Sequence, residues 1–151
     1  MTQTDWSHLP NAKHIDWVIA SVKVNPEKWT AAYTAACTAA CTAAYNAAWS
    51  AAYNTARTTA NDAVWDASRD AASWVRSGAW LAAKGTILAL IAWDDCAYMI
   101  ESEVDEIKIL AKLGDQRATL LLPACSVYNE TKSITPLISY ISKIKKCLFS
   151  I

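Results

Sequence analysis

Residues 29–72 repeat a unit of four: one large or distinctive residue, one small polar residue and usually two alanines. The run begins WTAAYTAACTAACTAAYNAAW at Trp29. Because an α-helix turns about every 3.6 residues, each repeat moves the large residue ~40° around the axis. The large residues therefore form a ridge that winds around the helix, not the straight seam of a coiled coil. This pattern predicts helices that meet several neighbours, with alanines that allow close approach.

The tetrad segment is too long to form one straight helix. A single helix over residues 26–77 would be ~75 Å long, which exceeds the size of a compact domain of this mass. The stretch 54–62, NTARTTAND, contains β-branched threonines, and Asn61 or Asp62 could cap a new helix. We therefore expect a break or a sharp bend between Asn54 and Asp62.

The stretches on either side of the tetrad segment also show helical patterns. Asn11, a favoured N-cap residue, precedes a segment with apolar positions on one face. The stretch 86–100, TILALIAWDDCAYMI, begins apolar on nearly every side, which predicts a buried helix. Gly78 and Gly85 flank AWLAAK, so we expect a boundary or kink in this stretch, before the buried helix.

The C-terminal third contains further helix boundaries. Gly114 and Asp115 indicate the end of one helix and the start of another, and Pro123 indicates an end or a kink. Thr135 and Pro136 predict the start of the last helix. No stretch alternates as a strand does, so we expect one all-α domain over residues 1–151. It should contain about six or seven helices, with the tetrad helices central.

Composition and charge narrow the classes of partner. The chain has 151 residues with only three glycines and four prolines, and its 14 basic and 14 acidic residues cancel. It lacks the basic surplus of duplex-binding proteins, so we expect no nucleic-acid partner. Residues 29–56 carry no charge, but small polar residues interrupt them, and Asp94 cuts the later apolar run. No stretch reaches the ~20 apolar residues of a membrane span, so we expect a soluble protein without a membrane partner.

The cysteines indicate a reduced compartment and no metal. The five cysteines include no CxxC pair, and the polar start of the chain does not resemble a secretory signal, which favours a cytoplasmic location. Cys37 and Cys41 are one helical turn apart and could supply two metal ligands. They occupy ridge positions that aromatic residues fill elsewhere, so small buried fillers are the favoured interpretation. We expect neither a metal nor a cofactor.

No catalytic motif is present, and we expect no enzyme. His8 and His14 are the only histidines, and no serine or cysteine lies in a recognised nucleophile motif. Asp94 and Asp95 are adjacent, so on a helix they would point ~100° apart and would not readily share a proton. The simplest interpretation is a buried aspartate paired with a cation at His14, Arg57 or Arg69.

One set of ridge residues has the chemistry of a ligand site. Aromatic faces stack on nucleobases, and arginine binds phosphate through two parallel hydrogen bonds. Either aspartate could accept hydrogen bonds from ribose hydroxyls. The candidate ligand-binding residues are Tyr45, Trp49, Tyr53, Arg57, Trp65, Arg69, Asp94 and Asp95. They predict a small-nucleotide pocket between helices, although the same residue types also build protein interfaces or fill a core.

Several stretches resemble a group of small Ala/Trp-rich proteins that are common in phage genomes. The resemblance rests on LPNAKHIDWVIASVKVNPEKW, on the tetrad run with WDASRDAA, on ILALIAWDDCAYMI and on LAKLGDQRATLLLPA. It covers residues 8–125, and the final stretch, SVYNETKSITPLISYISKIKKCLFSI, departs from it. The tetrad is also similar to bacterial immunity proteins of the polymorphic-toxin type. Neither resemblance supplies a set of catalytic residues.

The resemblance implies a function without chemistry. A small phage protein with an aromatic and arginine interior is similar in kind to the sponges that phages use against nucleotide-signalling defences. It implies a viral protein of the host bacterial cytoplasm that sequesters an immune signal, an ADP-ribose derivative or a cyclic nucleotide. The alternative is an immunity-type protein or inhibitor that binds a protein partner through an aromatic-rich surface.

The sequence also predicts self-association. The tetrad segment is uncharged over residues 29–56, and an apolar stripe runs along one face of the last predicted helix. A symmetric homodimer is the default expectation for such faces. The residues of the stripe are Leu137, Ile141, Ile144 and Leu148.

Overall fold

The computed structural model describes the chain over residues 6–72 and 78–149, with side chains over residues 6–57 and 78–132. In these ranges the chain forms six α-helices and one 3₁₀ helix and contains no β-strand. The elements are α1 (Ala12–Val24), α2 (Pro26–Ala40), α3 (Thr42–Ala72), α4 (Gly78–Ala92), η1 (Ala97–Glu101), α5 (Val104–Lys112) and α6 (Gln116–Phe149). The predicted all-α class is confirmed.

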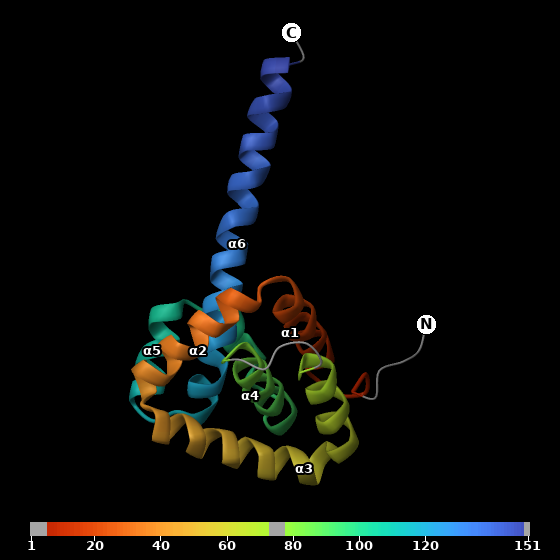
Figure 1. Ribbon diagram of the computed structural model, residues 1–151, viewed down its shortest axis with the longest axis vertical. Coiled ribbons are helices and arrows are strands. Elements are labelled where there is room, and N and C mark those ends of the chain that lie inside the picture. Colours follow the sequence, from red (N-terminus) through yellow and green to blue (C-terminus); the bar gives the residue numbers. More distant parts are fainter. Residues whose placement is uncertain (1–5, 73–77, 150–151) are drawn as a thin grey trace.

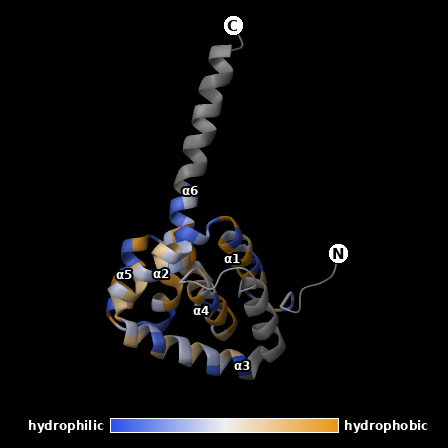
Figure 2. Ribbon diagram, viewed as in Figure 1, coloured by the Kyte–Doolittle hydropathy of each residue, from blue (hydrophilic) through white to orange (hydrophobic). Residues whose placement is uncertain are grey.

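Helix α4 is buried on all sides. Every residue from Gly85 to Ile91 is buried, and α4 contacts α1, α2, α3 and α6. Figure 1 shows α4 in green, between the other helices, and Figure 2 shows more strongly apolar residues on α4 than on the described part of α3. The predicted buried helix over residues 86–100 is confirmed only as far as Ala92: it begins earlier, at Gly78, and a turn and then η1 follow it. Gly85, where we expected a boundary or kink, lies inside the helix.

The alanines of the tetrads form the packed faces of α2 and α3. Ala32 and Ala36 of α2 are buried, as are Ala48, Ala52 and Ala56 of α3. Both helices contact α4. Since alanine projects little from the helix surface, backbones can approach closely along these faces. The repeated alanines therefore have a packing role, and the large residues lie beside this face.

The large residues wind from the core to the surface along each helix, as the period of four predicts. In each of two series the first residue is buried, the second and third are half-buried, and the fourth is exposed. Three steps of ~40° amount to ~120°, enough to carry a side chain from the core to solvent. The series are Trp29, Tyr33, Cys37 and Cys41, and then Tyr45, Trp49, Tyr53 and Arg57.

The second series can begin in the core because the tetrad segment breaks at Cys41. This residue ends α2 with a φ of 67°, a left-handed conformation that is uncommon outside glycine. The break changes the phase of the ridge, and Tyr45 is buried again. We expected a break or a sharp bend between Asn54 and Asp62, and there is no break, because α3 is one helix over these residues. Its ribbon does change direction between its gold and yellow-green parts (Figure 1).

Asn11 fastens α1 to α4 and does not cap its own helix. It precedes α1 as predicted, but its side chain makes no capping hydrogen bond. Its Nδ2 donates to the carbonyl oxygens of Leu90, at 2.9 Å, and Trp93, at 3.3 Å. The start of α1 is therefore tied to the end of α4 through backbone acceptors.

The boundaries near the start of α6 are confirmed, and those within it are wrong. Gly114 has a φ of 94°, and the Oδ1 of Asp115 accepts a hydrogen bond from the backbone nitrogen of Ala118 at 3.1 Å. Helix α6 therefore begins where the sequence predicts. Helix α6 then continues through Pro123 and Pro136, where we expected a kink and a new helix. The apolar stripe predicted for the tail lies outside the described side chains.

Candidate functional site

Tyr45, the first residue of the predicted site, belongs to the core. It is only 2% exposed. Its ring meets Tyr33 edge-on, with 5.2 Å between the ring centroids, and its hydroxyl donates to the carbonyl oxygen of Leu81 at 3.4 Å. Burial raises the pKa of the Tyr45 hydroxyl, which stays protonated at neutral pH. Tyr45 is a packing residue, fixed by α4.

The next two ridge residues, Trp49 and Tyr53, stack on each other. The rings of Trp49 and Tyr53 are nearly parallel, at 8°, with centroids 5.4 Å apart. A face that is stacked on a neighbouring ring does not accept a nucleobase. Arg57 is exposed beyond them. The structure therefore brings three of the four predicted aromatics together, Tyr45, Trp49 and Tyr53, and leaves Arg57 at the surface.

Two residues of α4 that sequence reasoning missed complete this group. The Nζ of Lys84 lies 5.3 Å from the ring centroid of Trp49 and 5.1 Å from that of Trp80. Burial lowers the pKa of Lys84, and the two indole faces favour its charged form. Trp80 and Lys84 are one turn apart, which is the signal that the sequence offered. We term the whole group the α3–α4 cluster: Tyr45, Trp49, Tyr53, Trp80 and Lys84.

The α3–α4 cluster is packed tightly against the backbone of α4. A Cβ atom at Gly85 would lie 2.7 Å from the hydroxyl oxygen of Tyr45 and 3.5 Å from Cδ1 of Trp49. The indole nitrogens of Trp49 and Trp80 are buried, without a hydrogen-bond partner in the described part of the chain. An unpaired buried donor costs about 1–3 kcal/mol, so these side chains are held by their packing.

Asp94 and Asp95 do not join the α3–α4 cluster. They lie in the turn after α4, and both are exposed, so the expected buried pair is wrong. Asp95 lies 3.4 Å from Arg117, a residue that the sequence analysis did not single out. The part of α4 that follows Lys84 spans ~12 Å and separates the aspartates from the cluster.

The other predicted site residues have mixed outcomes. Trp65 and Arg69 lie outside the described side chains, so their part in a ligand site stays a prediction. Cys37 is half-buried, whereas Cys41 is exposed and ends α2, so the expectation of a buried filler is wrong at Cys41. Among the described residues there is no group of three potential metal ligands.

A cavity of about 290 Å³ lies between α1, η1 and α6, and we term it the α1–α6 cavity. It is lined by Lys13, His14, Trp17, Ile100, Glu101 and Tyr128. The rings of Trp17 and Tyr128 meet at 70° with centroids 5.8 Å apart. Behind them Trp29, whose ring lies 6.0 Å from that of Trp17, is fully buried. The cavity therefore has two aromatic walls that rest on the core.

Charged side chains border the same cavity. Lys13 and Glu101 are exposed, and His14 is half-buried. Lys132 does not line the cavity itself, but its Nζ lies 5.7 Å from the ring centroid of Tyr128, which does. Lys13 is one turn from Trp17, as Lys132 is from Tyr128, so each wall pairs an aromatic residue with a lysine. Sequence could show each pair but not that the rings of Trp17 and Tyr128 meet.

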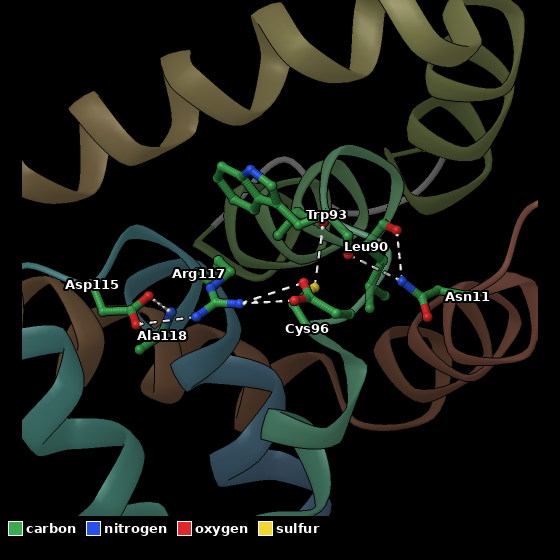
Figure 3. A network of polar contacts seen from close by, with 9 residues as sticks. Asn11, Leu90, Trp93, Cys96, Asp115, Arg117 and Ala118 are labelled. Atoms are coloured by element: carbon green, nitrogen blue, oxygen red, sulfur yellow. Dashed lines mark hydrogen bonds and ion pairs between the residues drawn. The ribbon is translucent and has the colours of Figure 1, made fainter.

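A second and more open hollow of about 570 Å³ lies between the turn after α4 and the start of α6; we term it the α4–α6 hollow. It is lined by Trp93, Asp95, Gly114, Asp115, Gln116 and Arg117. Figure 3 shows Asp115 to the left of the Arg117 guanidinium and the Trp93 indole above it.

Arg117 is held between two carboxylates in this hollow. Its Nη1 lies 3.4 Å from each carboxylate oxygen of Asp95, and its Nη2 lies 3.7 Å from Oδ2 of Asp115. Partial burial acts to lower the pKa of Arg117, but attraction to Asp115, Asp95 and then Tyr98 raises it overall. The guanidinium therefore stays charged and is largely neutralised by its neighbours.

Comparison with known proteins gives no guide to the function. No protein-family model, curated protein or solved structure matches the chain. In the part of the chain that the structure describes, no helix has an apolar run long enough to cross a bilayer. The function is therefore inferred from the chemistry of the two hollows and of the α3–α4 cluster.

Proposed function

We propose that the chain is a non-enzymatic protein that binds and sequesters a small nucleotide, and that the α1–α6 cavity receives its base. The observation that carries the proposal is the combination, in one cavity, of two aromatic walls and a cationic rim. We place the site in this cavity and not on α3, because Trp49 and Tyr53 stack on each other and the buried Tyr45 packs against Tyr33.

The aromatic walls suit a nucleobase. Trp17 and Tyr128 are both half-buried, so each offers part of its surface to the cavity while its position is fixed by packing. Stacking of a base on an aromatic side chain contributes about 1–3 kcal/mol. The edge-on arrangement of the two rings leaves space beside them, which a parallel stack would not.

The rim suits a phosphate and a ribose. Lys13 and Lys132 place cations near the two aromatic walls, and His14 adds a second nitrogen donor on α1. Hydrogen bonds from charged groups to phosphate contribute about 1.5–3 kcal/mol each. Glu101 is an acceptor for ribose hydroxyls or for the amino group of a base. The cations exceed the single carboxylate, as an anionic ligand requires.

The volume favours a ligand of modest size. About 290 Å³ lies at the lower limit of ~300–1,000 Å³ that is usual for small-molecule sites. A cyclic mononucleotide fits this scale, whereas an ADP-ribose derivative would place one of its halves outside the cavity. Sequestration requires tight binding alone, which agrees with the similarity in kind to phage sponges and with action in a host bacterial cytoplasm.

The experiment compares ligands and two matched variants. The protein is titrated with 3′,5′-cyclic AMP, AMP and ADP-ribose by isothermal calorimetry, and retained ligand is released by heat and identified. We expect intact ligand, and binding weakened about 5- to 100-fold by Trp17→Leu, the loss of one stacking wall. Tyr53→Leu, a half-buried aromatic of the α3–α4 cluster, is the control and should leave binding unchanged.

Three outcomes would contradict the proposal. Chemically altered ligand would indicate an enzyme, and failure of all three nucleotides to bind at millimolar concentration would exclude sequestration. Loss of binding in Tyr53→Leu but not in Trp17→Leu would return the site to α3. The thermal midpoint of each variant, measured alongside, separates loss of the site from loss of the fold.

A second candidate function is the binding of a protein partner, as an immunity-type protein or inhibitor. The observation that favours it is a set of large apolar side chains exposed to solvent near η1 and α5. Tyr98 is 58% exposed and Leu113 is 78% exposed. Large aromatic and aliphatic side chains of this kind act as anchors in protein interfaces.

A further inference from the structure

We propose that the α4–α6 hollow docks an arginine side chain of a protein partner, with an apolar residue of the partner on the adjacent surface. The inference is independent of nucleotide binding and rests on the second candidate function. The exposed apolar residues indicate only that a protein could bind, whereas the hollow indicates which side chain of the partner would bind there.

The charges of the residues at this hollow favour a cationic ligand. Asp94 and Asp95 are exposed, and Asp115 is half-buried at the start of α6. Two of these carboxylates, those of Asp95 and Asp115, line the hollow, and among the lining residues they face one guanidinium, that of Arg117. Negative charge is therefore in excess, and a partner with a positive side chain gains from it.

The excess carboxylate is positioned to accept. Asp95 reaches Arg117 only at 3.4 Å, and its side chain remains 79% exposed. A carboxylate offers about four acceptor positions, so two long contacts with the same Nη1 atom leave room for a second donor group. A guanidinium fits a carboxylate through two parallel hydrogen bonds, which an ammonium cannot form.

An anion is disfavoured at the same place. The N-terminus of α6 would attract a phosphate if it were free. Its cap is Asp115, whose Oδ1 accepts the backbone N–H of Ala118 at 3.1 Å, so a carboxylate already occupies this position. The α4–α6 hollow and the α1–α6 cavity therefore select ligands of opposite charge.

The apolar surroundings complete a protein-binding surface. The indole of Trp93 lines the hollow and offers a face on which a guanidinium can stack. Tyr98 and Leu113 are exposed nearby in sequence, on η1 and at the end of α5, and Tyr98 is close enough to act on Arg117. Tryptophan, tyrosine and arginine dominate the energetics of protein interfaces.

The surface is held in place by the fold. The carbonyl oxygen of Trp93 accepts from Nδ2 of Asn11 at 3.3 Å and from the backbone nitrogen of Cys96 at 3.4 Å. The thiol of Cys96 donates to the carbonyl oxygen of Ala89 at 3.5 Å, which pins the turn to α4 (Figure 3). A turn fixed in this way loses little entropy when a partner binds.

The test uses three labelled peptides and the full chain. Fluorescence anisotropy at low salt compares a peptide of alternating leucine and arginine with otherwise identical lysine and glutamate peptides. We expect the order arginine, lysine, glutamate, with no measurable binding of the last. Asp95→Asn should weaken arginine-peptide binding about tenfold or more, as expected for one hydrogen bond between charged groups. Asp105→Asn, an exposed acid of α5, is the matched control and should leave binding unchanged.

Each contrary result overturns the docking proposal. Equal losses in Asp95→Asn and Asp105→Asn would show attraction to overall charge alone. Free arginine that binds as tightly as the peptide would indicate a small-molecule site, and binding of the glutamate peptide would reverse the charge argument. Nucleotide titration of Asp95→Asn keeps the two proposals apart, because the α1–α6 cavity does not contain Asp95.

Discussion

The α3–α4 cluster and the α1–α6 cavity are built from the same kinds of residue and reach opposite results. Each combines aromatic rings with a lysine one helical turn from one of them. In the cluster Trp49 and Tyr53 stack in parallel, and Gly85 leaves no space beside the Tyr45 hydroxyl. In the cavity the rings of Trp17 and Tyr128 meet at 70°, and a volume of about 290 Å³ remains.

The difference comes from the elements that carry the rings. Helices α3 and α4 meet along continuous faces, where alanines allow close contact and the aromatics can fill what remains. The cavity lies where α1 and α6 meet η1, a 3₁₀ helix of five residues that presents no long face. Residue type therefore indicates which chemistry is present, and packing decides whether a ligand can reach it.

The largest expected effect tests which region holds the fold together. Tyr45→Ala should lower the free energy of unfolding by about 3–5 kcal/mol, the loss typical of a fully buried aromatic. Trp17→Ala should cost clearly less, because Trp17 is half-buried and already borders a cavity. Urea unfolding followed by circular dichroism measures both. An equal or larger loss in Trp17→Ala would show that the cavity wall is as structural as the cluster.

Much of the fold could be predicted because it follows from local periodicity. The change from buried to exposed between Tyr45 and Arg57 is the drift of a four-residue repeat on a 3.6-residue helix. The burial of α4 follows from apolar residues on all its sides, and the start of α6 follows from the conformational freedom of Gly114 and the capping carboxylate of Asp115.

The break at Cys41 and most of the candidate site could not be predicted in this way. The sequence around Cys41 continues the repeat without any glycine or proline, so no helix-breaking residue marks the position. The contact between Trp17 and Tyr128 joins the first and last described helices, and no local pattern carries that information. The α3 aromatics drew attention because they repeat, yet a repeat of this kind is also how a core is filled.

The second effect tests how tightly the α3–α4 cluster is closed. Gly85→Ala should destabilise the protein by about 1–3 kcal/mol, because the new Cβ would lie 2.7 Å from the Tyr45 hydroxyl oxygen. Alanine is the better helix former by about 1 kcal/mol, so destabilisation would be a direct sign of crowding. The measurement is again urea unfolding.

The double variant Gly85→Ala with Tyr45→Phe identifies the crowded atom. Removal of the hydroxyl opens the space, so the double variant should be more stable than the sum of the two single changes predicts. Simple additivity would mean that the backbone, not the hydroxyl, absorbs the new methyl group.

The third effect concerns the link between the two regions. Asn11→Asp should cost about 1–2 kcal/mol, because Asp lacks the amide N–H that donates to the carbonyls of Leu90 and Trp93. Aspartate is as good an N-cap as asparagine, so a role in capping alone would leave the stability unchanged. Calorimetric unfolding of Asn11→Asp and of the wild type distinguishes the two roles.

The smallest effect, and the most specific, concerns the lysines of the two regions. Burial lowers the pKa of Lys84 below its ordinary value of about 10.5. At pH values between the lowered pKa and the ordinary one, the unfolded chain therefore binds more protons than the folded chain. Stability from this group therefore rises with pH across that window. In Lys84→Met the rise is absent, while the contributions of buried groups such as Tyr45 remain in both proteins and cancel in the difference.

At neutral pH Lys84→Met should differ from the wild type by no more than ~1 kcal/mol, because the lost contacts with two indoles are offset by relief of a buried charge. The stability advantage of the wild type should then grow as the pH is raised towards 10. Lys13→Met, which removes an exposed lysine of the α1–α6 cavity, provides the reference curve. If the two difference curves run parallel, the Lys84 ammonium is as well solvated as that of Lys13, and the α3–α4 cluster is open to water in a way that its packing does not allow.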